Sequence, residues 1–457
     1  MSIAIRQILL FLCLLAAVGA AQPEVSEHRL ENGLKILVKE DHRAPVVVSQ
    51  VWYKVGSSYE YGGITGVSHI LEHMMFKGTE DYSPGDFSKI VAENGGQENA
   101  FTGRDYTAYF ESLEKTRLPI SFEMEADRMR NLLLTGQEFD KEREVVLEER
   151  RMRTDDQPRS KVYEYFSAVA HTNGGYQNPI IGWTDDIRNL SIQDLQDWYE
   201  LWYAPNNATL VVVGDVDPDE VFSLAEQYFG PLESGNPVAT KPRIEVEQIG
   251  ARRLNVRLPA ELPYLLMGYK VPVLKTIGSE KEAYALEVLA GILDGGDSAR
   301  LSSRLVRGKQ MAVSASAEYD LYARLTSLFL FDATPAQGYS LEQVEKALKA
   351  EIQELQTRLV APDELDRVKA QVLADNIYDR DSVFNQAMQL GELETVGLGW
   401  QRMDQYVERI NQVTAADILV SAKKYLNEDK LTVAYLDPLP IDRNKPAPRI
   451  TGDHHAH

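Results

Sequence analysis

The apolar residues near the start of the chain follow the pattern of β-strands joined by a tight turn. In HRLENGLKILVKED, two apolar stretches flank Asn32-Gly33, a dipeptide typical of hairpin turns. The next apolar run, APVVVSQVWYKVGS, predicts another strand. Longer stretches with helical spacing follow, and a strand is expected from Thr209 to Gly214 between two helices. The first half of the chain therefore predicts strands combined with long helices.

The same order of patterns occurs twice along the chain. In the first half, EFDKEREVVLEERRMRTDD precedes LSIQDLQDWYELWYAPNNATLVVVGD, and in the second half ELDRVKAQVLADNIYDRDS precedes VTAADILVSAKKYLNEDKLTVAYLDP. Between the halves, ESGNPVATKPRIEVEQIG contains prolines and little periodicity, which is typical of a linker. We expect two copies of one unit of roughly 200 residues, too long for a solenoid repeat. A chance likeness between helix-helix-strand patterns is the alternative.

The first residues carry the pattern of an export signal. Arg6 precedes an apolar run from Ile8 to Val18, which ends in small residues before polar sequence begins. The run is too short for a membrane span, and an uncleaved N-terminal anchor is the alternative. The domain organisation that we predict is a signal peptide at 1–21, an N-terminal domain at 22–236, a linker at 237–250, a homologous second domain at 251–441 and a flexible tail at 442–457.

Composition and charge narrow the class of protein. The chain has 457 residues, of which 44% are hydrophobic and 26% charged, as in globular proteins of two or three domains. Its net charge of −21 argues against a nucleic-acid partner, because binding phosphates needs a basic face. The single cysteine, Cys13, lies in the signal segment, so the mature chain suits an oxidising compartment. We predict a periplasmic protein of a Gram-negative bacterium, with no stable membrane insertion after signal cleavage.

The stretch HILEH, residues 69–73, falls in an amphipathic helix. We expect this helix to run from about Ile64 to Phe76, with Gly78 available to end it. At about 100° per residue, its apolar side chains share one face. These are Val67, Ile70, Leu71, Met74 and Met75.

The opposite face of this helix carries His69, Glu72 and His73. The two histidines are one turn apart, so their imidazole nitrogens can bind one metal ion, with Glu72 beside it. H-x-x-E-H is the reverse of the H-E-x-x-H order, and both orders bring the same three side chains together. A chance match on an ordinary helix is the alternative.

A zinc site needs a third protein ligand and one position open to water. The segment TGQEFDKEREVVLEERRMR predicts a helix that begins at a capping box of Thr135 and Glu138. Glu142, Val145, Val146 and Glu149 form a stripe that continues Phe139 and is expected to face the interior, whereas Glu144 and Glu148 lie off it. A buried carboxylate is costly unless it meets a metal or a cation, which favours Glu142 and Glu149. A charged surface helix is the alternative.

HILEH followed by Glu149 resembles the inverzincin zinc peptidases of the pitrilysin and insulysin type. Within them the chain looks most like the short branch related to mitochondrial processing peptidase and its bacterial relatives, over essentially the whole mature chain. The resemblance implies an α+β fold of two tandem homologous domains, each a largely antiparallel β-sheet flanked by helices. It also implies one Zn²⁺ per chain on His69, His73 and Glu149, with Glu72 as general base and Glu142 as a carboxylate that steadies the site.

The segment ENGGQENAFTGRDYTAYF resembles the part of this family that follows the metal helix. There, Asn99 and Ala100 would lie on an edge strand that pairs with an extended substrate. Pairing of this kind recognises backbone, so it suits peptides or unfolded proteins of varied sequence. On net charge alone, an acidic interior would favour basic peptides among them. A turn followed by an ordinary strand is the alternative.

One segment departs from the family pattern. Active members usually carry an arginine and a tyrosine seven residues apart that hold substrate, and VRGKQMAV places Val306 and Val313 at these positions. A shifted alignment could restore part of the pair through Arg304, Arg307 or Tyr319. We therefore expect a homologous partner subunit that lacks the zinc motif and supplies the arginine and tyrosine. A non-catalytic scaffold or assembly subunit of the same fold is the alternative to an enzyme.

Overall fold

The computed structural model describes residues 25–236 and 243–441, and their strands form two sheets. The first sheet has the order β1-β2-β6-β3-β5-β4 and the second the order β7-β11-β8-β10-β9. The strands of the first sheet are β1 (Val25–Arg29), β2 (Lys35–Glu40), β3 (Val46–Tyr53), β4 (Gln97–Thr102), β5 (Thr107–Glu114) and β6 (Ala208–Gly214). Those of the second are β7 (Arg252–Pro259), β8 (Tyr264–Val271), β9 (Ala312–Tyr319), β10 (Ser327–Pro335) and β11 (Leu431–Leu439).

The two sheets share one topology, apart from the additional strand β1. Strands β2, β6, β3, β5 and β4 correspond in order to β7, β11, β8, β10 and β9. In each sheet the first pair of this series is parallel, β2 with β6 and β7 with β11, and the following pairs are antiparallel. The predicted α+β fold of two homologous, largely antiparallel halves is thereby confirmed.

The hairpin predicted at Asn32-Gly33 is present between β1 and β2, which pair antiparallel. The N–H of Leu30 donates to the carbonyl of Leu34 at 3.0 Å, which encloses a loop of residues 31–33. Gly33 ends this loop with φ 93°, in the left-handed region that favours glycine. The local turn residues therefore set the register of the first hairpin.

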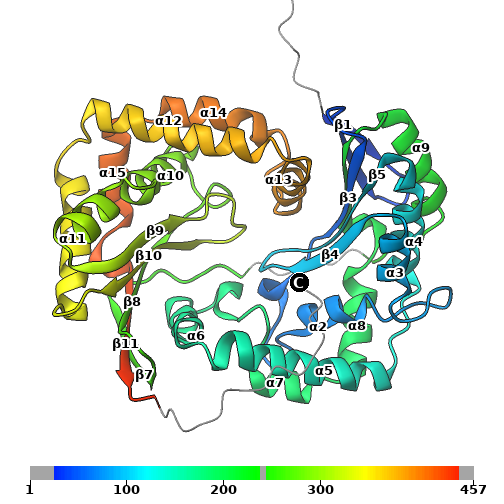
Figure 1. The fold of residues 1–457 in the computed structure, drawn as a ribbon, viewed down its shortest axis with the longest axis horizontal. Coiled ribbons are helices and arrows are strands. Elements are labelled where there is room, and N and C mark those ends of the chain that lie inside the picture. The colour runs from blue at the N-terminus through cyan, green and yellow to red at the C-terminus, as the bar shows by residue number, and fades with distance from the viewer. Residues whose placement is uncertain (1–24, 237–242, 442–457) are drawn as a thin grey trace, which may run out of the picture.

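Helices flank both sheets (Figure 1). In the first half they are α2 (Val67–Met74), α3 (Asp86–Glu93), α4 (Leu118–Arg130), α5 (Gly136–Arg150), α6 (Pro158–Ala170), α7 (Thr184–Asn189), α8 (Ile192–Trp202) and α9 (Pro218–Phe229). In the second half they are α10 (Glu280–Asp294), α11 (Leu341–Thr357), α12 (Pro362–Asp379), α13 (Val383–Thr395), α14 (Arg402–Gln412) and α15 (Ala415–Tyr425). A π-helical segment, Arg151–Asp155, follows α5 directly.

Each half covers a face of its own sheet with a helix from the other half. Helix α13 packs on β3 and β6 of the first sheet, where Leu390 joins a core cluster with Trp52 and Val211. Helix α6 packs on β7, β8 and β11 of the second sheet, where Phe166 meets Leu266. Figure 1 shows α13 reaching toward β3 and α6 lying beside the second sheet. The two halves are thus held together by apolar packing in both directions.

A glycine allows close approach at each of these helix–sheet contacts. A Cβ added to Gly391 of α13 would lie 2.1 Å from Cε2 of Trp52, and one added to Gly268 of β8 would lie 2.8 Å from Cζ of Phe166. Both distances are far below van der Waals contact, so a larger residue would force the helix away from the sheet. The exchange of helices therefore depends on these two small residues.

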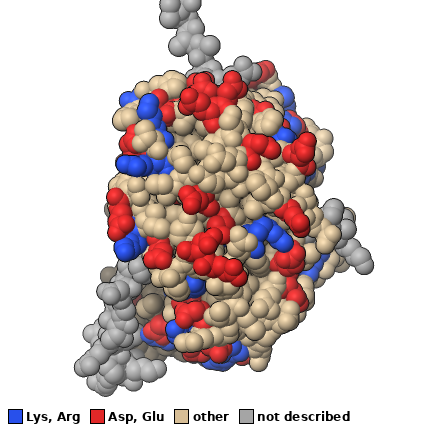
Figure 2. Space-filling view, turned by 90° about the vertical axis from the view of Figure 1, so that its right-hand side faces the viewer, with Lys and Arg blue, Asp and Glu red and all other residues tan. Residues whose placement is uncertain are grey.

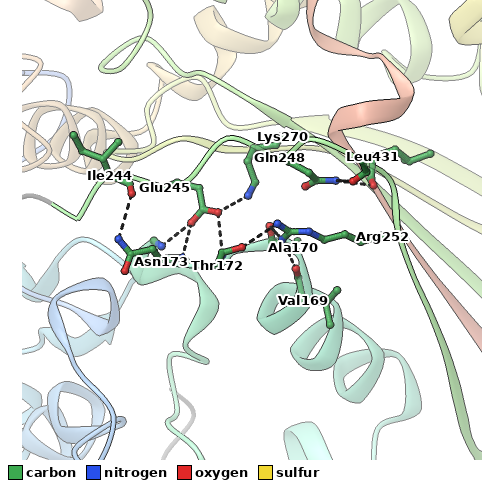
Figure 3. A network of polar contacts seen from close by, with 12 residues as sticks. Val169, Ala170, Thr172, Asn173, Ile244, Glu245, Gln248, Arg252, Lys270 and Leu431 are labelled. Carbon is green, nitrogen blue, oxygen red and sulfur yellow. Dashed lines mark hydrogen bonds and ion pairs between the residues drawn. The ribbon is translucent and has the colours of Figure 1, made fainter.

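The segment after residue 242, where the sequence predicts a linker, is fixed to both halves (Figure 3). The carboxylate of Glu245 accepts hydrogen bonds from the backbone N–H groups of Thr172, Asn173 and Gly174 at 2.9, 3.1 and 2.6 Å. It also pairs with the ammonium of Lys270 on β8, and the two side chains are only 3% and 6% exposed. This buried ion pair attaches the linker to the end of α6 and to the second sheet.

Several sequence predictions lie outside the described residues. These are the signal peptide at 1–21, residues 237–242 of the linker and the tail at 442–457.

Within residues 25–236 and 243–441, none of the helices has the length and apolar character needed to cross a membrane. Figure 2 shows acidic and basic side chains interspersed among uncharged residues over the face of the first half.

Candidate metal centre

Helix α2 presents the HILEH segment. It runs from Val67 to Met74, shorter than the expected range, because Gly66 with φ 90° precedes it in the left-handed region. The carboxylate of Glu60 accepts the backbone N–H groups of Gly66 and Ser68 at 2.8 and 2.9 Å, which satisfies donors left open at the helix start. The five apolar residues predicted to share a face are all fully buried, as expected.

Helix α5 supplies the third member of the cluster. The Thr135 hydroxyl accepts the N–H of Glu138 at 3.4 Å, so the predicted N-cap is present, but the Glu138 carboxylate binds Lys141 instead of closing the capping box. Glu142 is buried and Glu149 is partly buried, as the stripe predicts. The inclusion of Val145 in that stripe is wrong, since this side chain is 48% exposed. It follows Glu144 on the side of the helix that faces solvent.

His69, His73 and Glu149 come together in space. One ligand atom of each lies within 4.8 Å of the others. Oε2 of Glu149 is 3.7 Å from Nε2 of His69 and 3.5 Å from Nε2 of His73. Ligands at about 2.0–2.1 Å from a tetrahedral zinc ion lie roughly 3.3 Å apart, so this spacing fits one ion with small adjustments. Two imidazoles and one carboxylate are also a donor set that zinc prefers.

Glu142 holds the second histidine. Its Oε2 lies 3.2 Å from Nδ1 of His73, and its Oε1 lies 2.7 Å from the ammonium of Lys77. Burial disfavours the charged ring, but hydrogen bonds with Glu142 and Glu149 outweigh burial and raise the pKa of His73 to about 9. Burial also opposes ionisation of Glu142, yet His73 and Lys77 lower its pKa below the usual range. Glu142 thus orients the ring so that Nε2 faces the cluster.

Glu72 lies beside the cluster in a buried position. Burial raises the pKa of this carboxyl to about 7, although the Thr102 hydroxyl donates a hydrogen bond to it. Oε1 of Glu149 pairs with the guanidinium of Arg153 at 2.7 Å. Burial opposes ionisation of Glu149, but contacts with His73 and further cations lower its pKa to about 2. A carboxyl that titrates near neutral pH suits proton transfer, whereas one that stays ionised suits metal binding.

The cluster opens into a cavity of about 610 Å³. Its wall comes from α2, from the segment at the end of β4, from α5 and α6, and from the second sheet. Charged and polar side chains in this wall are His69, Glu72, His73, Thr102, Arg104, Glu149, Arg153, Thr154, Arg159, Ser160, Tyr163, Glu164, Ser167, Asn178 and Tyr264. Both halves of the chain therefore contribute to one cavity.

The predicted substrate strand is next to this cavity. Asn99 and Ala100 lie on β4, an edge strand of the first sheet within the described residues, and Ala100 lines the cavity. Oδ1 of Asn99 accepts the N–H of Ala100 at 2.8 Å. That this edge pairs with substrate stays a prediction.

Four residues near the cluster were missed by the sequence analysis. Thr102 and Glu60 give no local signal, because each meets α2 only through the fold. Arg153 follows Glu149 by one helical turn, so i, i+4 spacing could have identified this ion pair. Tyr264 belongs to the second half, and no pattern in the chain connects it with the HILEH segment.

In the segment VRGKQMAV, valines stand where family members usually carry an arginine and a tyrosine. This segment belongs to the second half and does not line the described cavity. Val313 on β9 is 61% exposed, and Val306 packs against the core of the second half. Arg304 pairs with two glutamates of α11, and the buried Tyr319 donates its hydroxyl to the carbonyl of Pro272 at 2.9 Å. Neither of these two side chains belongs to the wall of the described cavity.

Comparison with known proteins identifies the family. The model described as insulinase, peptidase family M16, matches residues 35–183, and the model described as peptidase M16 inactive domain matches residues 189–372. The zinc protease PqqE of Helicobacter pylori is 33% identical over 435 residues, which cover 93% of this chain and 97% of that protein. The chain belongs to peptidase family M16.

Solved structures of M16 relatives agree with this fold. A protease from Helicobacter pylori has a TM-score of 0.86 at 33% identity and covers 91% of this chain and 100% of its own. The first half of the periplasmic protease PqqL from Escherichia coli has a TM-score of 0.75 at 20% identity, covering 91% of this chain and 92% of its own, and supports the fold alone. Together with the names of the M16 relatives, the family supports a metallopeptidase role.

Proposed function

We propose that this chain is a zinc-dependent endopeptidase that hydrolyses peptides or unfolded segments. The observation that carries the proposal is the convergence of His69, His73 and Glu149 beside the buried Glu72 in one cavity. In this proposal the three converging residues hold one zinc ion. When bound, zinc supplies an open coordination position and a Lewis acid.

The side chains of the chain carry the proton transfers. Glu72 takes a proton from the attacking water and gives it to the leaving amine, a role that its buried position beside the three ligands supports. The Thr102 hydroxyl holds one oxygen of Glu72, so the other oxygen is left for the water. Glu142 fixes the ring of His73 through Nδ1.

Substrate would bind as an additional strand. We infer that the edge of β4 at Asn99 and Ala100 pairs with the peptide backbone, next to the cavity that Ala100 lines. The proposal keeps a homologous partner subunit, which supplies the arginine and tyrosine absent at Val306 and Val313. Cleavage of the signal peptide would place the protein in the periplasm.

Peptide hydrolysis by the purified chain tests this function. A mixed library of quenched fluorescent peptides is incubated with the chain alone and with its zinc-less homologue from the same genome, and Glu72→Gln is the control. We expect zinc-dependent cleavage that needs the homologue and is lost in Glu72→Gln. Cleavage by the chain alone would refute the partner, and zinc binding without cleavage in either mixture would refute the enzyme in favour of a scaffold subunit.

A further inference from the structure

The cavity carries two arginines that the proposed chemistry does not use. We propose that Arg159 and Arg104 form a carboxylate-binding subsite in this cavity, which selects peptides with an acidic side chain or a free C-terminus near the bond to be cut. This inference rests on the proposed peptidase function and names its substrate class.

Arg159 is fixed in position while its charge stays unpaired. It lies in the first turn of α6, where Nη2 donates to Oγ1 of Thr334 at 2.8 Å. Its guanidinium carbon lies 4.8 Å from the centre of the Tyr264 ring, which belongs to the second sheet. Within the described residues 25–236 and 243–441, the Arg159 guanidinium forms no ion pair with a carboxylate. A guanidinium has five N–H donors, so most of them remain available to a ligand.

Arg104 approaches the same helix from the first sheet. It follows Thr102 closely in the chain, and its Nη2 donates to the hydroxyl of Tyr163 on α6 at 2.8 Å. Tyr163 lies one helical turn after Arg159, so Arg104 contacts α6 one turn away from the position that carries Arg159. Arg104 likewise has no ion pair within the described part of the chain. The cavity side of α6 therefore carries two cations and the phenol of Tyr163.

The carboxylates of the cavity wall are already engaged. Glu164 pairs with Arg150 at 2.7 Å and with Lys161 at 2.8 Å. Glu149 pairs with Arg153 and, with Glu72, belongs to the proposed zinc site. Among the described residues of the wall, the charge left without a partner is positive.

Further acidic residues lie close to the subsite. Asp105 and Asp320 act electrostatically on Arg104, but Asp105 pairs with Arg324, and Asp320 accepts the backbone N–H groups of Tyr322 and Ala323. Asp332 is near the Tyr264 hydroxyl, where burial and this carboxylate raise the pKa of Tyr264. The carboxylate of Asp332 accepts a hydrogen bond from Ser316 and forms no ion pair with Arg159. The preference of the cavity is thus opposite to the one expected from net charge, because the acidic residues that set the net charge lie mostly outside this wall.

The chemistry of the two guanidiniums favours a carboxylate. Arginine binds carboxylates through two parallel N–H···O bonds, and such charge-assisted bonds are about twice as strong as neutral ones. In a peptide, this group comes either from an aspartate or glutamate side chain or from the C-terminus. Both sources present the same planar anion, so the experiment has to separate them.

Peptide binding to the full chain carrying Glu72→Gln tests the subsite without turnover. Fluorescence anisotropy is measured with labelled peptides in matched pairs, with and without added zinc. In one series, aspartate replaces asparagine at each position in turn, and in the other a free C-terminus replaces an amide. Arg159→Gln and Arg104→Gln are compared with Arg188→Gln, which removes an exposed arginine of α7 outside the cavity wall.

We expect the acidic member of at least one pair to bind about tenfold more tightly, as for one charge-assisted hydrogen bond. Arg159→Gln and Arg104→Gln should remove this preference while leaving the affinity for the neutral peptide, which shows that the variants are folded. Arg188→Gln should keep it. The series in which the preference occurs identifies the source of the carboxylate.

Equal binding within every pair would overturn the subsite, as would a preference that survives both cavity substitutions. That outcome is independent of the hydrolysis experiment on the chain with its natural Glu72. Hydrolysis without any acidic preference refutes only the subsite, and an acidic preference without hydrolysis refutes only the peptidase.

Discussion

The contact between Glu142 and His73 gives a quantitative prediction for zinc affinity. Glu142→Gln keeps the shape of the side chain but removes the charge that lies 3.2 Å from Nδ1 of His73. Carboxylates in this position raise the basicity of a metal-binding histidine and fix its tautomer, and their loss typically costs about 10–100-fold in metal affinity. At about 1.4 kcal/mol per factor of ten, this corresponds to about 1.4–2.8 kcal/mol.

The structure places this substitution in the upper part of that range. Glu142 is buried, and its other oxygen holds Lys77 at 2.7 Å. In Glu142→Gln the ammonium of Lys77 therefore loses its carboxylate while staying close to the site. Its uncompensated positive charge then opposes the binding of the zinc ion. The two effects act in the same direction.

Competition with a chromophoric chelator measures the zinc dissociation constant of the purified chain. Glu144→Gln is the matched control, because it removes the same charge from an exposed position of the same helix. A dissociation constant within about twofold of the natural chain in Glu142→Gln would refute the reasoning. So would an equal loss of affinity in Glu144→Gln, which would point to net charge instead of the contact with His73.

Three further predictions follow from the site and from the packing of the two halves. Glu72→Gln should lower the rate of peptide hydrolysis by about 10²–10⁴-fold with unchanged zinc content, and a smaller loss in initial-rate assays would contradict its role as general base. Gly391→Ala should lower the free energy of unfolding by about 1–3 kcal/mol, because the added Cβ would meet Trp52. Gly136→Ala is the control and should not lower it, because open space surrounds Gly136. Thermal unfolding compares the two variants. Hydrogen bonds from the guanidinium of Arg43 lower the pKa of Asp41 from 3.8 to about 2. The contribution of the Asp41 carboxylate to stability is therefore complete above pH 3.8 and is lost as the pH falls to about 2. Asp41→Asn should accordingly destabilise the chain near neutral pH and have little effect near pH 2, and a constant difference over this range in unfolding experiments would contradict the pKa.

The sequence singled out the residues that converge in the candidate metal cluster because each belongs to a regular helix. The spacing of His69 and His73 puts both rings on one side of any helix that contains them, whatever surrounds it. Glu142 and Glu149 were found in the same way, from the side of a helix that also carries Phe139. The limit of this reasoning is Val145, which helical spacing placed with the interior and the fold leaves exposed.

The sequence by itself also predicted strands combined with long helices and the duplication, since the repeated order of these elements is a property of the chain, and its family resemblance implied the α+β class. Only the tertiary structure decided how the halves combine. The exchange of α6 and α13, the Thr102 contact with Glu72 and the pairing of Arg159 with Tyr264 join residues far apart in sequence. Such contacts produce no periodic pattern in the sequence. A side chain that meets its partner through the fold is selected for packing at a single point, whereas the periodicity of a helix or strand reflects the repeat of that element. The proposed metal ligands can therefore be predicted from local pattern, whereas the cavity wall, and with it the proposed choice of substrate, comes from the way the two halves pack together.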